Sequence, residues 1–190
     1  IPVLGVLLGY TLAKRFTSLA HFWLGFALAL SPVCAWIAIR GLEVIAHPAD
    51  VFPSVILGAA ILFWVAGFDI IYACQDFAFD KAAGLHSVPV RLGVAGALRM
   101  AAICHGFMIV LLVAVPRTHL LAGPDTNLGG CWWIGVVAVA ILLIYEHSIV
   151  RADDLTRVNI AFFNVNAIVS VGLLAAAAID LALLSPVVGN

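Results

Sequence analysis

Three carboxylates stand close together in a chain that otherwise holds few charges. Asp69, Asp76 and Asp80 are three of only 10 acidic residues in 190, and with Tyr72 they are spaced 3, 4 and 4 positions apart. On one helix this spacing places them along a single face. Carboxylates that share a face at the edge of a bilayer repel one another unless a cation lies among them. Magnesium or calcium suits such oxygens, and magnesium also keeps positions open for substrate phosphates. The segment therefore predicts a metal–diphosphate site at the end of a transmembrane helix.

The elements that position these residues are expected to lie in a membrane. Hydrophobic residues make up 65% of the chain and charged residues 10%, and the mean hydropathy is +1.18. A soluble domain has about 45–50% apolar and about 25% charged residues. The net charge of −1 gives no basic footprint for nucleic acid. The four cysteines stand singly and are predicted to be buried, inert thiols. We expect an integral membrane protein that contacts membrane lipid and no nucleic acid.

Six apolar segments predict an all-α membrane protein, a transmembrane helical bundle that forms a single domain over residues 1–190. The segments cover residues 1–13, 17–39, 51–72, 94–115, 131–150 and 159–184. These runs are too long and too continuous for the strands of a barrel. The first is shorter than the roughly 20 residues of a full span. We therefore take it as the tail of a cut helix and expect an N-terminal part to precede it.

The basic residues fall unevenly on the two sides that alternating spans define. Of the nine Lys and Arg residues, two fall on one side, Arg40 and Arg117. The other side receives seven, which are Lys14, Arg15, Lys81, Arg91, Arg99, Arg151 and Arg157. The positive-inside rule assigns the richer side to the cytoplasm. We expect a multi-pass protein of the cell inner (plasma) membrane with its acidic segment and active-site loops in the cytoplasm.

Several residues on the same side are candidate partners of a diphosphate. Lys14 and Arg15 suit a clamp on phosphate or carboxylate, since Arg offers a bidentate fork and Lys a point charge. The alternative is a topological anchor that snorkels to the headgroups. Arg91 either contacts a diphosphate or simply follows the positive-inside rule. Asp69 is expected to bind metal or to hold Lys14, Arg15 or Tyr72 in place.

Alternation of the spans brings these candidates to one face of the membrane. We expect Asp76, Asp80, Arg91 and the pair Lys14 and Arg15 to border one cavity with apolar walls, because a diphosphate needs both metal-binding acids and cations within reach.

Two histidines lie near the same membrane face. His21 and His147 either neighbour the site or serve as structural hydrogen-bonding partners.

Two stretches carry a resemblance to a known family. Asp76-x-x-x-Asp80-x-x-x-Gly84-x-x-Ser87, preceded by Asp69-Ile-Ile-Tyr72, resembles the second aspartate-rich motif of the UbiA superfamily of intramembrane prenyltransferases. Tyr10-Thr-Leu-Ala-Lys14-Arg15-Phe-Thr17 is similar to the YPxxKRxT stretch of its 4-hydroxybenzoate polyprenyltransferase branch, with Thr11 in place of proline. The resemblance covers nearly the whole chain.

The resemblance implies a nine-helix fold around a central cavity, of which about six segments are present here. It implies transfer of a polyprenyl group from a polyprenyl diphosphate to a small aromatic acceptor such as 4-hydroxybenzoate, in ubiquinone or menaquinone biosynthesis. Asp76 and Asp80 would carry Mg²⁺, and Asp69 would support them. The catalytic carboxylates are then Asp69, Asp76 and Asp80, and the substrate-binding residues are Lys14, Arg15, Tyr72, Ser87 and Arg91.

One feature of the family is missing from the sequence. Its first motif, N-x-x-x-D-x-x-x-D, does not occur in these 190 residues. We therefore expect a Mg²⁺-dependent aromatic polyprenyltransferase of which these residues alone are inactive.

Two other functions stay open. A cation-coupled transporter would use the three carboxylates to bind a moving ion, and it would predict broken helices and inverted repeats near the midplane. The other alternative is a non-catalytic membrane fragment.

Overall fold

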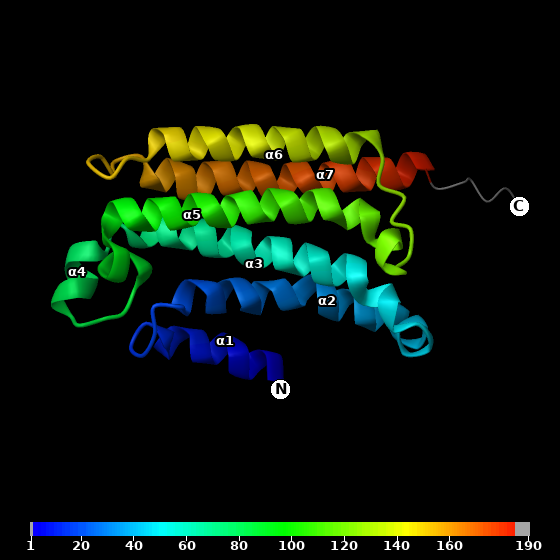
Figure 1. The fold of residues 1–190 in the computed structure, drawn as a ribbon, viewed down its shortest axis with the longest axis horizontal. Helices are drawn as coiled ribbons and strands as arrows, with labels where there is room; N and C mark the ends of the chain where they lie inside the picture. Colours follow the sequence, from blue (N-terminus) through cyan, green and yellow to red (C-terminus); the bar gives the residue numbers. More distant parts are fainter. Residues whose placement is uncertain (1, 185–190) are drawn as a thin grey trace, which may run out of the picture.

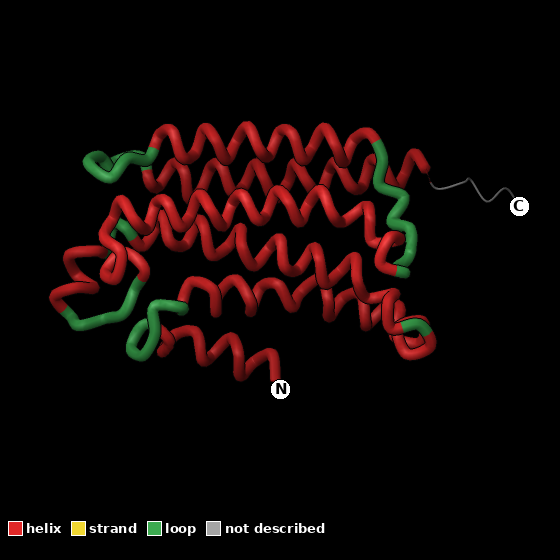
Figure 2. Tube along the Cα trace, viewed as in Figure 1, coloured by secondary structure: helices red, strands yellow, loops and turns green. Residues whose placement is uncertain are grey.

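The computed structural model describes residues 2–184, which form helices joined by short turns (Figure 2). In chain order these are α1 (Pro2–Ala13), α2 (Ala20–Ala46), η1 (Pro48–Val51), α3 (Phe52–Ala73), α4 (Phe77–Ala82), α5 (Val88–Ala114), η2 (Val115–Leu121), α6 (Gly130–Ile149), η3 (Ile160–Val165) and α7 (Asn166–Leu184). Five stretches are long and apolar enough to cross a membrane: Ala20–Ala46, Pro48–Ala73, Val88–Leu121, Gly130–Ile149 and Ile160–Leu183. The predicted transmembrane helical bundle is confirmed. Ile1, where the first predicted segment begins, lies outside the described residues.

The long helices run side by side, and α3 occupies the middle of the bundle (Figure 1). It packs extensively against α2 on one flank and α5 on the other, while α6 packs on α7. Small residues explain the close α2–α3 approach. A Cβ at Gly25 of α2 would run into the backbone oxygen of Leu62, and one at Gly58 of α3 would lie 2.7 Å from the backbone oxygen of Ala29. Such small residues let two helices pack closely inside a membrane.

Two helix boundaries differ from the sequence-based prediction. α2 continues through Arg40, where a break was expected, and that residue only kinks the helix with φ −116° and ψ 21°. α5 begins at Val88, before the predicted start at residue 94, because Ser87 caps it and Pro89 stands in its first turn. The chain then bends at Gly93, whose φ of +71° is readily adopted by glycine.

Short helix α4 and the turn between α1 and α2 gather at one end of the bundle, here named the α4 end (Figure 1). At the opposite end, Arg40 donates to both carboxylate oxygens of Asp50 at 2.9 and 2.8 Å. The indole of Trp36 donates to the same carboxylate at 3.0 Å. The guanidinium of Arg117 lies 4.8 Å from the ring centroid of Trp133. The two basic residues of this end are therefore held by local partners.

Candidate active site

The acidic segment does not lie on one helix, which corrects the prediction of a single stripe. Asp69 and Tyr72 lie on α3, Asp80 lies on α4, and Asp76 lies in the turn between them. The amides of residues 74–76 each donate to the carbonyl three positions back, at 3.1–3.2 Å. Such bonds tighten the end of a helix into a 3₁₀-type turn. The turn redirects the chain, so helical spacing no longer holds across it.

Lys14 meets Asp80 at the α4 end. Lys14 Nζ lies 3.5 Å from Asp80 Oδ2, and the Asp80 side chain is only 3% exposed. A buried carboxylate is costly unless a cation or hydrogen-bond donors accompany it, and Lys14 supplies the cation. The carbonyl of Lys14 also accepts a hydrogen bond of 2.7 Å from the His86 amide. The turn after α1 is therefore tied to both α4 and the loop that follows it.

Asp69 has a different partner, on α2. Its Oδ2 lies 2.7 Å from Nδ1 of His21, which is fully buried. His21 is thus a neighbour of the candidate site, one of the two possibilities that the sequence left open. His147 is not placed there, because its Nε2 lies 3.0 Å from Nδ1 of His105 in the contact between α5 and α6.

A cavity of about 440 Å³ lies where the α1–α2 turn meets the start of α5. Arg91 lines it and donates to the Ser18 hydroxyl at 3.4 Å. The complete lining is Phe16, Thr17, Ser18, His86, Ser87, Val90 and Arg91. Asp76, Asp80, Lys14 and Arg15 are not among these lining residues. Asp80 instead packs inward against Lys14, and the single cavity that would join them to Arg91 stays a prediction.

The remaining candidates are more exposed or lie apart. Arg15 is exposed, and its side chain makes no hydrogen bond or ion pair with the part of the chain that the structure describes. Ser87 is fully buried and caps α5, its hydroxyl accepting from the Val90 amide at 3.4 Å. The side chains of Tyr10 and Thr11, which belong to the first resembling stretch, lie outside what the structure describes.

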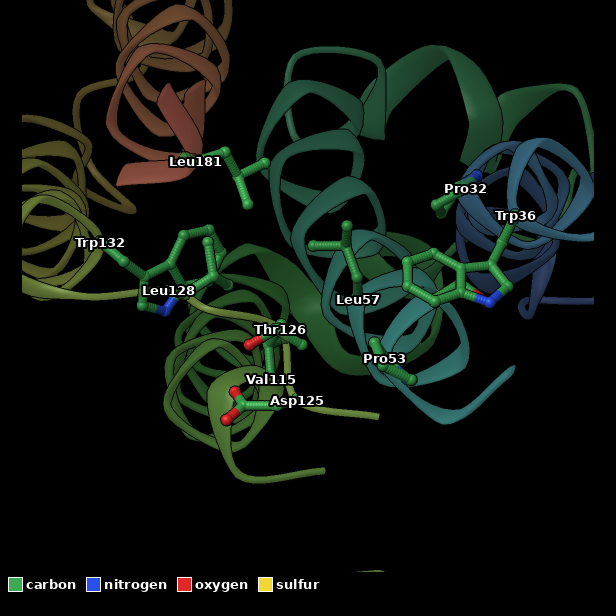
Figure 3. Close-up of a pocket in the computed structure, with 12 residues that line it drawn as sticks. Pro32, Trp36, Pro53, Leu57, Val115, Asp125, Thr126, Leu128, Trp132 and Leu181 are labelled. Carbon is green, nitrogen blue, oxygen red and sulfur yellow. The ribbon is translucent and has the colours of Figure 1, made fainter. Parts of the chain in front are cut away.

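Tyr72 begins an apolar path along α3. Its ring centroid lies 4.4 Å from that of Phe162. Further along the same face, Trp64 and Phe68 line a cavity of about 350 Å³ with Phe162 and Asn166. A second cavity, of about 310 Å³, follows at the opposite end of the bundle. Figure 3 shows this cavity, with Leu57 of α3 among its lining side chains. Two cavities thus succeed one another between α2, α3 and α7.

The described side chains do not by themselves surround a metal ion. Residues 2–184 contain no group of three or more His, Cys, Asp and Glu side chains arranged around one ion. Magnesium, however, is commonly held by one or two carboxylates together with substrate phosphates and water. Asp76 and Asp80 provide two carboxylates, so their chemistry fits this cation. Cys74, beside them, does not suit this cation, because magnesium prefers oxygen ligands to soft thiolates, and its thiol donates to the Ile70 carbonyl at 3.3 Å.

Comparison with known proteins assigns the chain to a family. The model of the UbiA prenyltransferase family matches residues 1–183. A 4-hydroxybenzoate octaprenyltransferase of Marinobacter nauticus is 28% identical over 157 residues, which is 83% of this chain and 48% of that protein. One from Nitrosomonas europaea is 29% identical over 182 residues, or 92% of this chain and 56% of that protein. The chain spans about half the length of these curated relatives.

A solved structure agrees with the sequence comparison. The apo structure of a UbiA homolog from Aeropyrum pernix K1 matches with a TM-score of 0.78 and 31% identity, over 95% of this chain and 62% of that chain. The fold and the acidic segment define a multi-pass membrane protein whose carboxylates and cations gather at one end of the bundle. The chain belongs to the UbiA prenyltransferase family.

Proposed function

We propose that the protein transfers a polyprenyl group from a polyprenyl diphosphate to a small aromatic acceptor such as 4-hydroxybenzoate, a step in ubiquinone or menaquinone biosynthesis. Family membership and the similarity to 4-hydroxybenzoate octaprenyltransferases support this reaction. The observation that carries it is the contact of Lys14 with Asp80, since it joins a basic and an acidic motif at one end of a membrane bundle. A diphosphate bound with magnesium needs both kinds of group.

Asp76 and Asp80 are the proposed magnesium ligands, with Asp69 as a third carboxylate of the site. When bound, the ion neutralises the charge that develops on the departing diphosphate. Lys14 is already within reach of Asp80, and Arg15 stands next to it with an exposed guanidinium. Both side chains are proposed to contact the diphosphate or the carboxylate of the acceptor.

The cavity lined by Arg91 and Ser18 is the proposed place for an anionic group beside the carboxylates. Arg91 and the hydroxyl groups of this cavity suit a carboxylate or phosphate oxygen. Ser87 shapes the cavity by fixing the start of α5.

The apolar face of α3 is the proposed wall for the prenyl chain. Tyr72 stands nearest to the carboxylates, and Phe68, Trp64, Ile61 and Leu57 continue the face through the two successive cavities. These side chains exclude water from the path, which protects an allylic cation from hydrolysis.

The proposed chemistry is an electrophilic aromatic substitution. The bond between the allylic carbon and the diphosphate oxygen breaks, and the diphosphate leaves with the electron pair. A ring carbon of the acceptor forms the new carbon–carbon bond with a π electron pair, and a base then takes the proton from that carbon, which restores the aromatic ring. Cationic side chains stabilise the leaving diphosphate, which is the electrostatic part of catalysis.

The test uses the full-length polypeptide of the reading frame that contains this chain, reconstituted in lipid. Radiolabelled 4-hydroxybenzoate and a polyprenyl diphosphate are supplied with Mg²⁺, and lipid-soluble product is counted. We expect product that EDTA abolishes and added Mg²⁺ restores. Binding of Mg²⁺ without product from a panel of aromatic acceptors would contradict the proposal and favour a transporter.

A further inference from the structure

A fully buried histidine connects three membrane-spanning helices at the α4 end. His21 is the second residue of α2, and its side chain is 0% exposed. Nδ1 lies 2.7 Å from Oδ2 of Asp69 on α3. The amide of Val88, the first residue of α5, donates to Nε2 at 3.5 Å. One imidazole therefore uses both of its nitrogens to link the acidic segment with the start of the next span.

These two contacts define where the imidazole carries its proton. The amide of Val88 is a donor, so Nε2 of His21 must accept. A ring that accepts at one nitrogen is neutral and carries its hydrogen on the other. Nδ1–H then donates to Asp69, whose carboxylate is an acceptor. Each hydrogen bond in the series from Val88 through His21 to Asp69 therefore joins one donor to one acceptor.

The other amides at the start of α5 are already used. The Val90 amide donates to the Ser87 hydroxyl at 3.4 Å, and the Arg91 amide donates to the Ser87 carbonyl at 3.1 Å. Pro89 has no amide hydrogen. This helix N-terminus therefore offers no spare donor to an anion, and the Val88 amide serves to orient His21.

Asp69 is partly open to solvent, unlike His21. Its side chain is 15% exposed. The hydrogen bond to His21 uses Oδ2, which leaves Oδ1 as the oxygen available to a ligand. A hydrogen bond to one oxygen of a carboxylate fixes the direction of the other oxygen. Residues that do not touch a bound metal orient its ligands in this way.

We propose that His21 is a positioning residue, which holds the carboxylate of Asp69 in one orientation toward bound magnesium diphosphate. This inference rests on the proposed function of the same site. His21 touches no substrate, because it is buried, and it acts through Asp69. Its link to Val88 also makes the orientation of Asp69 dependent on the position of α5.

The chain offers a conservative variant and a disruptive one. Glutamine has one donor and one acceptor group at its end, so His21→Gln preserves both hydrogen bonds, whereas His21→Leu keeps the bulk and removes both. His105→Leu is the matched control, because His105 is another buried histidine that contacts α3. The readouts are kcat, the Mg²⁺ concentration for half-maximal rate, the calorimetric affinity for inorganic diphosphate with Mg²⁺, and thermal unfolding.

We expect His21→Leu to lower kcat about 10- to 100-fold and to weaken Mg²⁺–diphosphate binding by a similar factor, the usual range for partners behind a metal site. His21→Gln should keep both kcat and the affinity for Mg²⁺–diphosphate within about threefold of the wild type. His105→Leu should change thermal unfolding without changing the Mg²⁺ requirement. Asp69→Asn combined with His21→Leu should be no worse than Asp69→Asn alone, because His21 acts through that carboxylate.

A measurement that does not depend on enzyme activity tests the hydrogen bonds of His21 directly. In the ¹⁵N spectrum of histidine-labelled protein, the signals that disappear in His21→Gln should belong to a neutral ring protonated at Nδ1. A ring protonated at Nε2 would overturn the inference, and so would a His21→Leu variant that unfolds earlier but keeps wild-type kcat and Mg²⁺–diphosphate affinity. A wild type that binds Mg²⁺–diphosphate but makes no product would instead overturn the proposed function, and the variants would still be compared by calorimetry.

Discussion

Lys14 Nζ lies 3.5 Å from Asp80 Oδ2, although the two residues are 66 positions apart in the chain. The contact joins the turn after α1 to α4. Because Asp80 is nearly fully buried and Lys14 is 28% exposed, the lysine is the group able to move when a further cation or an anion arrives. The pair therefore has two proposed roles, to neutralise Asp80 in the free protein and to supply a cation to the diphosphate.

Separating these two roles requires a double variant. Lys14→Met should destabilise the fold by about 1–3 kcal/mol, less than a fully buried pair because Lys14 is partly exposed. Lys14→Met combined with Asp80→Asn should recover that stability, since no unpaired buried charge remains, but should stay inactive. Thermal unfolding and prenyl transfer are measured on the same preparations. Recovered activity in the double variant would show that the pair is structural.

Removing a proposed metal ligand should abolish turnover without preventing membrane insertion. Asp76→Ala and Asp80→Ala each remove a carboxylate that suits Mg²⁺, and we expect a loss in kcat of about 100-fold or more. Asp153→Ala is the control, because Asp153 is exposed on another loop and pairs with the exposed Arg151. If either site variant keeps most of its activity at saturating Mg²⁺, the metal assignment is wrong.

Narrowing the cavity in Figure 3 should shorten the prenyl chain that the enzyme accepts. Leu57→Trp adds bulk where the apolar path along α3 enters that cavity, at the end of the bundle away from the carboxylates. We expect long-chain diphosphates to lose rate while short ones do not, because only long chains reach Leu57. The measurement is kcat/KM across a series of chain lengths, with Leu183→Trp on the exposed surface of α7 as control. An equal loss of kcat/KM for all chain lengths would mean that the prenyl chain does not occupy this cavity.

The sequence predicts the spans well because each is a continuous apolar run, and the structure confirms five of them as candidate membrane crossings. It predicts their ends less well. Polar residues such as Arg40 suggest a break, but α2 continues past Arg40 with only a kink at that residue. The start of α5 was missed because the cap at Ser87 precedes the apolar run by several residues.

The sequence also predicts which candidate residues share one end of the bundle, because alternation of spans decides that. It does not predict their pairing. The turn at residues 74–76 separates Asp80 from Asp69, and the two carboxylates then find Lys14 and His21 on different elements. Contacts of this kind depend on helix rotation and register, which hydropathy does not encode. The sequence indicates His21 only by its position, as a single histidine near the same membrane face as the three carboxylates.

Close packing of α2 on α3 makes Gly25 sensitive to added volume. Gly25→Ala should lower stability by about 1–3 kcal/mol, because the new methyl group meets the backbone oxygen of Leu62, which cannot move aside as a side chain does. Gly172→Ala is the matched control on α7, where a Cβ meets nothing within 4 Å. Thermal unfolding in lipid measures both. Equal effects would mean that α2 and α3 are farther apart than the structure places them.

The orientation of the bundle in the membrane follows from charge and has a direct test. Seven of nine basic residues fall on the side of the acidic segment, which the positive-inside rule places in the cytoplasm. In a variant with Cys34, Cys74, Cys104 and Cys131 replaced by alanine, single cysteines are introduced as Asp153→Cys or Asp125→Cys. Both aspartates are exposed and lie in loops at opposite ends of the bundle. A membrane-impermeant maleimide added to intact cells should label Asp125→Cys and leave Asp153→Cys unlabelled until the cells are opened. The reverse pattern would place the carboxylates and Lys14 outside the cytoplasm, where a polyprenyl diphosphate made in the cytoplasm does not reach them, and it would contradict the proposed function together with the orientation.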